Sequence, residues 1–121
     1  MSDASLTFTL CIRGTQAEFA GQQEEACALY RQAWDAAADD YDACIAAHYV
    51  ARCQSTPDET LHWNEIALAR AESAEDDRPH LYPSLYVNLG QAHEQLGHTA
   101  EAERFFGWRR IGAGHEENSI P

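Results

Sequence analysis

The sequence contains no lysine. All eight of its basic residues are arginines, and they are outnumbered by twenty acidic residues. A formal net charge of −12 gives a surface that repels phosphate, and no basic stripe interrupts it. This composition argues against a nucleic-acid partner. It keeps a small protein soluble and also suits a basic ligand. Together with the many alanines, the use of arginine alone indicates the codon bias of a GC-rich bacterial genome.

Long apolar runs are also missing. No stretch approaches the roughly 20 consecutive apolar residues that a membrane span requires. The first five residues lack the basic lead and the apolar run of a secretory signal. We therefore expect a cytoplasmic protein that does not bind a membrane. Its 121 residues suit a single domain, because two independent cores would each be too small.

The cysteines occur at Cys11, Cys27, Cys44 and Cys53, and no two of them form a C-x-x-C pair. Their long intervals are untypical of zinc-binding or redox motifs. In a cytoplasmic chain, where thiols stay reduced, we interpret all four as small buried hydrophobic residues.

Local signatures of catalysis are absent as well. The chain has no G-x-S-x-G motif and neither of the glycine-rich loops that bind phosphate. Glu59-x-x-His62 has the spacing used in carboxylate-bridged di-iron bundles, but no second Glu-x-x-His accompanies it. His93 and His98 do not complete a ligand set. We therefore predict no enzymatic activity, no metal site and no other cofactor.

What the chain does contain is helix-forming sequence with regularly spaced helix breakers. Alanine is abundant and β-branched residues are few, which favours helices. Gly21 is a natural left-handed helix terminator, and Thr56 can cap a helix whose first residue is Pro57. These signals predict an all-α chain with helices over residues 6–20, 23–38, 41–54, 57–73, 79–96 and 99–111. The fifth helix begins either at Pro79 with a bend or near Pro83.

Small and aromatic residues recur along these helices at a fixed interval. The first set is Gly14, Ala17, Ala26, Tyr30 and Ala33. Its counterparts 34 residues later are His48, Ala51, Thr60, Asn64 and Ala67. A further 42 residues on, the same positions hold Gly90, His93, Ala102, Phe106 and Arg109. The eight additional residues indicate an insertion at about residues 75–82, between repeats over about 7–40, 41–74 and 83–116.

The third repeat resembles the tetratricopeptide pattern. Tyr86-x-x-Leu89-Gly90-x-x-His93, then Leu96-Gly97 and Ala102-x-x-x-Phe106, are similar to its order of aromatic, Leu-Gly, aromatic, and then Ala and Phe. The resemblance covers about residues 7–116. It implies three helix-turn-helix units stacked into a short right-handed superhelix, in which small residues let the helices of each hairpin approach closely. The proline that often closes such a unit is replaced by Ala38, Glu72 and Gly114.

In this architecture the first helix of each hairpin lines a concave groove that binds a peptide. Tyr49 and Arg52 stand out, because an aromatic and a guanidinium one turn apart can hold an extended backbone or a carboxylate. Alternatively, Tyr49 packs between units and Arg52 pairs with Asp42 or Glu18. By helical spacing, the predicted peptide-binding residues are Cys11, Thr15, Ile45, Tyr49, Arg52, Asn88 and Gln91.

The family's two-carboxylate clamp, which captures acidic chaperone tails, requires cations that this chain lacks. The corresponding positions hold Cys11, Thr15, Ala46, Ser84 and Asn88. A basic or apolar protein or peptide fits the acidic surface better. We therefore expect an adaptor that binds such a partner in its groove.

The last predicted helix carries apolar residues that no following helix covers. Solenoids usually end in a cap with a polar outer face, whereas residues 112–121 form a short polar tail. Phe105, Trp108 and Ile111 therefore predict an apolar patch. The alternative function is a homo-oligomer, such as a homodimer, that assembles through this uncapped helix.

Overall fold

The computed structural model describes residues 5–74 and 82–114, with side chains described over 5–74 and 85–107. These residues form six helices: α1 (Leu6–Phe19), α2 (Gln23–Asp35), α3 (Asp40–Ala51), α4 (Pro57–Ser73), α5 (Tyr82–Gln95) and α6 (Thr99–Gly114). The predicted all-α class is confirmed, and every helix end lies within three residues of its predicted position. In this part of the chain, no helix has both the length and the apolar character needed to cross a membrane.

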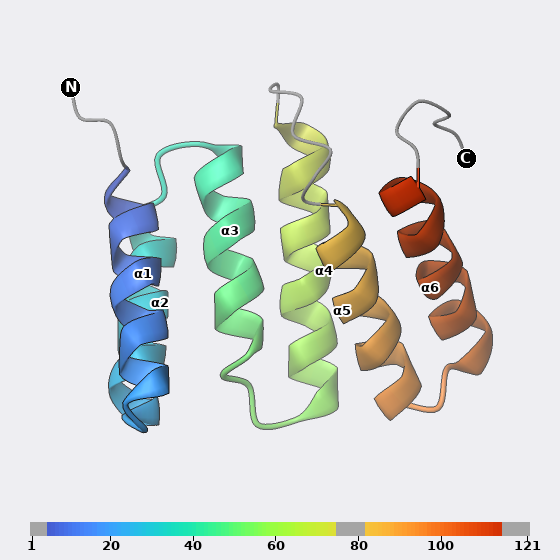
Figure 1. Cartoon of the computed structure of the whole chain (residues 1–121), viewed down its shortest axis with the longest axis horizontal. Helices are drawn as coiled ribbons and strands as arrows, with labels where there is room; N and C mark the ends of the chain where they lie inside the picture. Colours follow the sequence, from blue (N-terminus) through green and yellow to red (C-terminus); the bar gives the residue numbers. More distant parts are fainter. Residues whose placement is uncertain (1–4, 75–81, 115–121) are drawn as a thin grey trace.

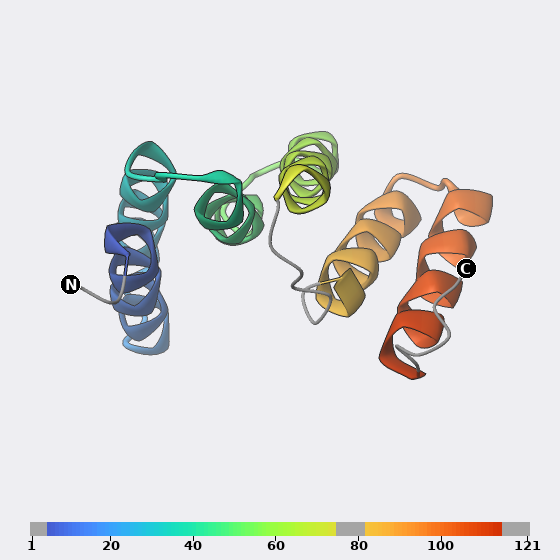
Figure 2. The same cartoon turned by 90° about the horizontal axis from the view of Figure 1, so that it is seen from above.

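The helices pack in consecutive pairs, α1 with α2, α3 with α4 and α5 with α6, and each pair contacts the next. In Figure 1, α2 lies behind α1, and α3, α4, α5 and α6 follow one another across the view. Seen from above, α1, α3 and α5 lie toward one side of the molecule, and α2 and α4 lie toward the other (Figure 2). The arrangement is consistent with three helix-turn-helix units.

Local signals at the helix ends explain why these ends could be predicted. The hydroxyl of Thr56 accepts a hydrogen bond from the backbone N–H of Glu59 at 3.2 Å, and Pro57 opens α4. Gly21 has a φ of +80°, which an L side chain rarely adopts. The fifth helix begins at Tyr82, so Pro83 lies in its first turn, whereas Pro79 falls outside the described residues.

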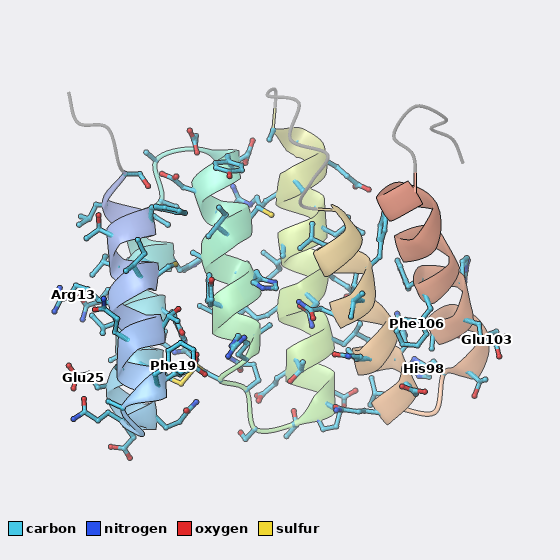
Figure 3. All side chains as sticks on the ribbon, in the orientation of Figure 1. Arg13, Phe19, Glu25, His98, Glu103 and Phe106 are labelled. Carbon is cyan, nitrogen blue, oxygen red and sulfur yellow. A yellow bond between two sulfur atoms is a disulfide. The ribbon has the colours of Figure 1, made fainter. Side chains whose placement is uncertain are left out.

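A glycine and an aromatic ring set the close approach of the helices in the first and third units. A Cβ atom added at Gly14 would come within 3.0 Å of the Tyr30 ring, and one added at Gly90 would meet the Phe106 ring equally closely. In both units the two residues are 16 positions apart. Figure 3 shows the Phe106 ring between α5 and α6. The glycine therefore makes room for the aromatic ring of the partner helix.

The buried core lies on both sides of α3. Toward the first unit, Ala46 and Val50 of α3 join a cluster around Leu10, Leu29 and Tyr30. Toward the third unit, α3 contributes to a second cluster, composed of Cys44, Ala47, Ala67, Ala71 and Leu85. The rings of Trp34 and Trp63 meet edge to face at 5.1 Å and pack against both clusters. The middle unit thus shares one buried cluster with the first unit and another with Leu85 of the third unit.

The interpretation of all four cysteines as buried hydrophobic residues is wrong for two of them. Cys27 of α2 and Cys53, just after α3, form a disulfide with Cα atoms 5.8 Å apart. Cys11 and Cys44 are buried free thiols, as expected, and burial raises their pKa values to about 12 and about 11. The stacking of the first two units brings Cys27 and Cys53 together, which their sequence interval alone does not indicate.

Candidate functional site

Two pockets adjoin α3. We call the first the apolar pocket: it has a volume of about 450 Å³ and lies between α1 and α3, with Leu85 of α5 at its edge. We call the second the amide pocket: it has a volume of about 440 Å³ and is lined by residues of α3, α4 and α5. His48 lines both pockets. The candidate functional site is this pair of pockets.

The apolar pocket is bordered by a stripe of large apolar side chains on α1. Phe8 and Ile12 are 46% and 48% exposed, and Phe19 is 88% exposed. Their intervals of four and seven residues place them on one face of the helix. Cys11, Ile45 and Leu85 supply less exposed lining. A contiguous apolar surface of this kind on a folded chain usually marks an interface.

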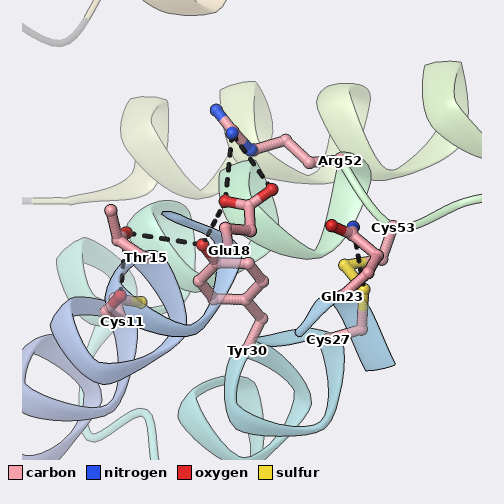
Figure 4. A network of polar contacts seen from close by, with 8 residues as sticks. All are labelled: Cys11, Thr15, Glu18, Gln23, Cys27, Tyr30, Arg52 and Cys53. Carbon is pink, nitrogen blue, oxygen red and sulfur yellow. Dashed lines mark hydrogen bonds and ion pairs between the residues drawn. A yellow bond between two sulfur atoms is a disulfide. The ribbon is translucent and has the colours of Figure 1, made fainter. Parts of the chain in front are cut away.

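A network of polar contacts joins α1, α2 and the end of α3 beside the apolar pocket (Figure 4). The hydroxyl of Tyr30 donates to Oε1 of Glu18 at 2.7 Å. Nη2 of Arg52 donates to both carboxylate oxygens of Glu18, at 3.0 and 3.2 Å. Burial, followed by the bond to Glu18, raises the pKa of Tyr30 to about 12. The network therefore fastens the first unit to the second.

Two roles were considered for Tyr49 and Arg52, ligand binding and packing between units. In the structure both residues make packing contacts between the first two units. The Tyr49 ring stacks on the Tyr30 ring with centroids 4.9 Å apart. Arg52 forms an ion pair with Glu18, and its guanidinium carbon lies 5.9 Å from the centre of the Tyr49 ring. Both residues still border a pocket, Tyr49 the apolar one and Arg52 the amide one. Packing and access to a ligand are therefore compatible at these positions.

The amide pocket combines carboxamide side chains with small aliphatic ones. Its carboxamide residues are Asn64, Asn88, Gln91 and Gln95, and its aliphatic residues are Ala51, Val87 and Ala92. Thr60, His48 and Arg52 complete the lining.

The surroundings of His48 determine its protonation state and its tautomer. Burial lowers its pKa, and the charge of Arg52 acts in the same direction, so the imidazole is neutral near pH 7. Nδ2 of Asn88 lies 2.9 Å from Nδ1 of His48. An amide nitrogen donates, so Nδ1 accepts and the imidazole proton resides on Nε2. This hydrogen bond links α5 of the third unit to α3 of the second.

Asn64 lines the same pocket from α4 and is buried, with 3% of its surface exposed. Among the described residues, none forms a hydrogen bond with its Oδ1 atom. An unpaired buried amide oxygen is unusual, because it loses its bond to water and receives no replacement.

The predicted groove residues divide between two pockets of different chemistry. Cys11, Thr15, Ile45 and Tyr49 line the apolar pocket. Arg52, Asn88 and Gln91 line the amide pocket.

Several residues that line the two pockets are missing from the predicted set, among them Ile12, Phe19 and Asn64. Ile12 and Phe19 continue the stripe that begins at Phe8, and the four- and seven-residue spacing was the available signal. Asn64 occupies the repeat position that holds an aromatic ring, Tyr30 or Phe106, in the other two units. This polar residue in place of a ring was the sequence signal that the middle unit packs differently.

The apolar patch predicted for self-association is described only at Phe105. Its ring is half-buried and stacks against His93 with centroids 5.5 Å apart. The Tyr86 ring lies 6.1 Å away on the same helix as His93. The side chains of Trp108 and Ile111 lie outside the described residues. Phe105 thus packs against α5, and the patch itself stays a prediction.

Within the described residues, no group of three or more His, Cys, Asp or Glu side chains is placed to hold a metal ion. The chain matches no family model, no curated protein and no solved structure. Its function is therefore inferred from its own geometry.

Proposed function

We propose that the chain is a tetratricopeptide-like adaptor, without enzymatic activity, whose apolar pocket binds a segment of a protein or peptide partner. The observation that carries this proposal is the exposed stripe of Phe8, Ile12 and Phe19 beside that pocket. Water contact with large apolar side chains is unfavourable, and a partner that covers them removes this cost.

The arrangement of the helices supports the tetratricopeptide part of the proposal. Consecutive helices pair, and two of the three pairs are closed by a glycine and an aromatic ring 16 residues apart. The first helix of each pair contributes to the lining of the apolar pocket, as the groove of such repeats requires. A short right-handed superhelix is the expected form of this stacking.

The partner's chemistry follows from the shape of the pocket and from the charge of the chain. Side chains such as Leu or Phe fit a lining that includes Cys11, Ile45 and Leu85. A net charge of −12 attracts cations and repels anions at a distance. The proposed occupant is therefore an apolar segment flanked by arginine or lysine.

Selection from a random peptide library on the purified chain tests the proposal. We expect the recovered peptides to share apolar anchors with basic flanks. Ile12→Glu should weaken their binding at least about tenfold, because it places an unpaired charge in the apolar contact. Gln32→Glu, at an exposed position of α2, adds the same charge and should leave affinity unchanged. Equal losses in both variants would show that charge alone governs binding and would contradict this site.

The alternative function, assembly through Phe105, Trp108 and Ile111, predicts a concentration-dependent mass in sedimentation. Trp108→Glu should then give a monomer. A monomer in both the wild type and the variant would remove this alternative. A dimer that Ile12→Glu dissociates would instead identify a second copy of the chain as the occupant of the apolar pocket.

A further inference from the structure

The middle unit departs from the packing rule that its two neighbours follow. Gly14 with Tyr30 and Gly90 with Phe106 form tight glycine–aromatic contacts across the first and third hairpins. At the same 16-residue interval, the second unit has His48 and Asn64. Both the small residue and the ring are thus replaced by polar side chains that line the amide pocket.

The replacement of a glycine and an aromatic ring by His48 and Asn64 is unfavourable for folding. A ring in the position of Asn64 would bury more apolar surface, whereas Asn64 buries an oxygen that has no donor among the described residues. Buried polar groups that lack a partner are rare and call for an explanation. The oxygen is itself buried, and a turn of the Asn64 amide about χ2 would bring it to the pocket face, where a ligand supplies the missing hydrogen bond.

We propose that the amide pocket binds a neutral primary carboxamide, the group at the end of a glutamine side chain. This site is separate from the apolar pocket, and the inference does not depend on peptide binding there. Glutamine presents an N–H donor and a carbonyl acceptor in one plane. The side chain of Asn64 has the same two groups, so the two amides can form a reciprocal pair.

The other lining residues suit the rest of such a ligand. The terminal amide of Asn64 turns easily about χ2, so it can direct its oxygen or its nitrogen to the incoming group. His48 also lines the pocket, and its neutral ring carries one N–H donor. Ala51, Val87 and Ala92 offer an aliphatic surface for the two methylene groups of a glutamine stem.

The charges around the pocket favour a neutral group over an ionised one. Of the described residues that line it, Arg52 is the one that is charged, and it already forms an ion pair with Glu18. A carboxylate would therefore meet a cation that is already neutralised, and it could not donate to Asn64. An ammonium group would face the guanidinium of Arg52 without a carboxylate in the lining.

Titration of the wild-type chain with small probes, followed by NMR of the side-chain amides, tests the proposal directly. The probes are L-glutamine, glutamine blocked as its N-acetyl methylamide, and L-glutamate. Glutamate has almost the shape of glutamine but lacks the amide donor.

We expect the Asn64 amide resonances to shift with glutamine, and glutamate to bind at least about tenfold more weakly. Binding of both glutamine forms supports a side chain as the natural ligand, and binding of the free form alone supports a free small molecule. Equal binding of glutamine and glutamate, or no shift with any probe, would overturn the proposal.

Two variants distinguish a ligand site from a structural role. Asn64→Leu removes the amide and keeps the branching at Cγ and the number of heavy atoms, and His48→Gly combined with Asn64→Tyr rebuilds the pair found in the other units. We expect each to lose glutamine binding. The melting temperature of Asn64→Leu should rise, whereas His48→Gly with Asn64→Tyr also removes the His48–Asn88 bond and tests binding only. A lower melting temperature in Asn64→Leu would show that Asn64 serves packing and would overturn the proposal. Ile12→Glu should retain glutamine binding, so failure of the apolar pocket and failure of this site are separable.

Discussion

The hydroxyl of Tyr30 donates to Glu18 at 2.7 Å, and the same carboxylate accepts from Arg52, which lies beyond the end of α3. Tyr30 is fully buried, with 0% of its surface exposed, and its ring also stacks on Tyr49. One side chain therefore fills the space opposite Gly14, closes the first hairpin and attaches that hairpin to the second unit.

Replacing Tyr30 by Phe keeps the ring and removes the hydrogen bond to Glu18. We expect a loss of about 1.5–3 kcal/mol in the free energy of unfolding at pH 7, the usual range for a bond to a charged acceptor. Urea unfolding followed by circular dichroism measures it. A loss below about 0.5 kcal/mol would show that the bond is offset by hydration of the hydroxyl in the unfolded chain.

The same residue predicts a loss of stability in alkali. The pKa of Tyr30 is raised from 10.0 to about 12, so the folded chain holds this proton more tightly than the unfolded chain does. The stabilisation of the folded chain by protonated Tyr30 is fully present below pH 10 and is lost as the pH rises through 12. The wild type should therefore lose more unfolding free energy than Tyr30→Phe between pH 9 and pH 11. Parallel losses would contradict the raised pKa.

The close contact at Gly14 predicts a cost for even one methyl group. In Gly14→Ala the new Cβ would overlap the Tyr30 ring, and we expect the free energy of unfolding to fall by about 1–3 kcal/mol, as in other overpacked cores. Gly107→Ala is the matched control, because nothing lies within 4 Å of its Cβ position. This control should gain about 0.5–1 kcal/mol from helix propensity. A gain in both variants would show that Tyr30 can move aside.

These contacts also show what the sequence could predict. Helix ends depend on neighbouring residues, such as the Thr56 cap and the left-handed Gly21, so they could be located within three residues. The repeat of Gly14 and Tyr30 at Gly90 and Phe106 correctly indicated two closely packed hairpins.

The disulfide could not be predicted, because the distance between Cys27 and Cys53 depends on how two units stack. The amide pocket had a signal in the sequence: His48 and Asn64 are polar, where the other units have a glycine and a ring. The division of the predicted groove into two pockets likewise depends on how α3 packs against α1 and how α5 packs against α4, which no local pattern encodes.

The disulfide predicts that reduction weakens the folded chain. Cys27 and Cys53 are 26 residues apart, and a bridge over a loop of this size typically contributes about 2–4 kcal/mol by restricting the unfolded chain. We expect a reductant to lower the free energy of unfolding of the wild type by this amount. The variant with Ser at both positions should start from the lower value and show no response to the reductant. A response in that variant would assign the effect to another cause.

The same bond allows the predicted cytoplasmic location to be tested. A reducing cytoplasm keeps thiols reduced, whereas oxidising compartments preserve disulfides. Rapid alkylation of intact cells followed by mass analysis should find four alkylated cysteines if the chain resides in the cytoplasm. A chain with only Cys11 and Cys44 alkylated would contradict that location, and the bond would then be a permanent part of the fold.

Protonation of His48 should weaken both the fold and the amide pocket. Burial, and then the charge of Arg52, lower the pKa of His48 in the folded chain below the value of 6.5 that it has in the unfolded chain. Between the folded and the unfolded pKa, the unfolded chain therefore binds the proton more readily. The stability linked to neutral His48 is fully present above pH 6.5 and is lost as the pH falls through the folded pKa. The ring is packed against Tyr49 at 5.2 Å and bonded to Asn88 of α5.

We expect NMR titration of the His48 ring to give a pKa below 6.5, and the free energy of unfolding to decrease from pH 7.5 to pH 5. His48→Gln should reduce this decrease, whereas His62→Gln, at an exposed position of α4, should leave it in place. Protonation also removes the Nδ1 acceptor of Asn88 and adds a positive charge beside Arg52. If the free energy of unfolding of His48→Gln decreased as much as that of the wild type, other groups would cause the pH dependence. Neutral His48 would then not stabilise the contact between α3 and α5.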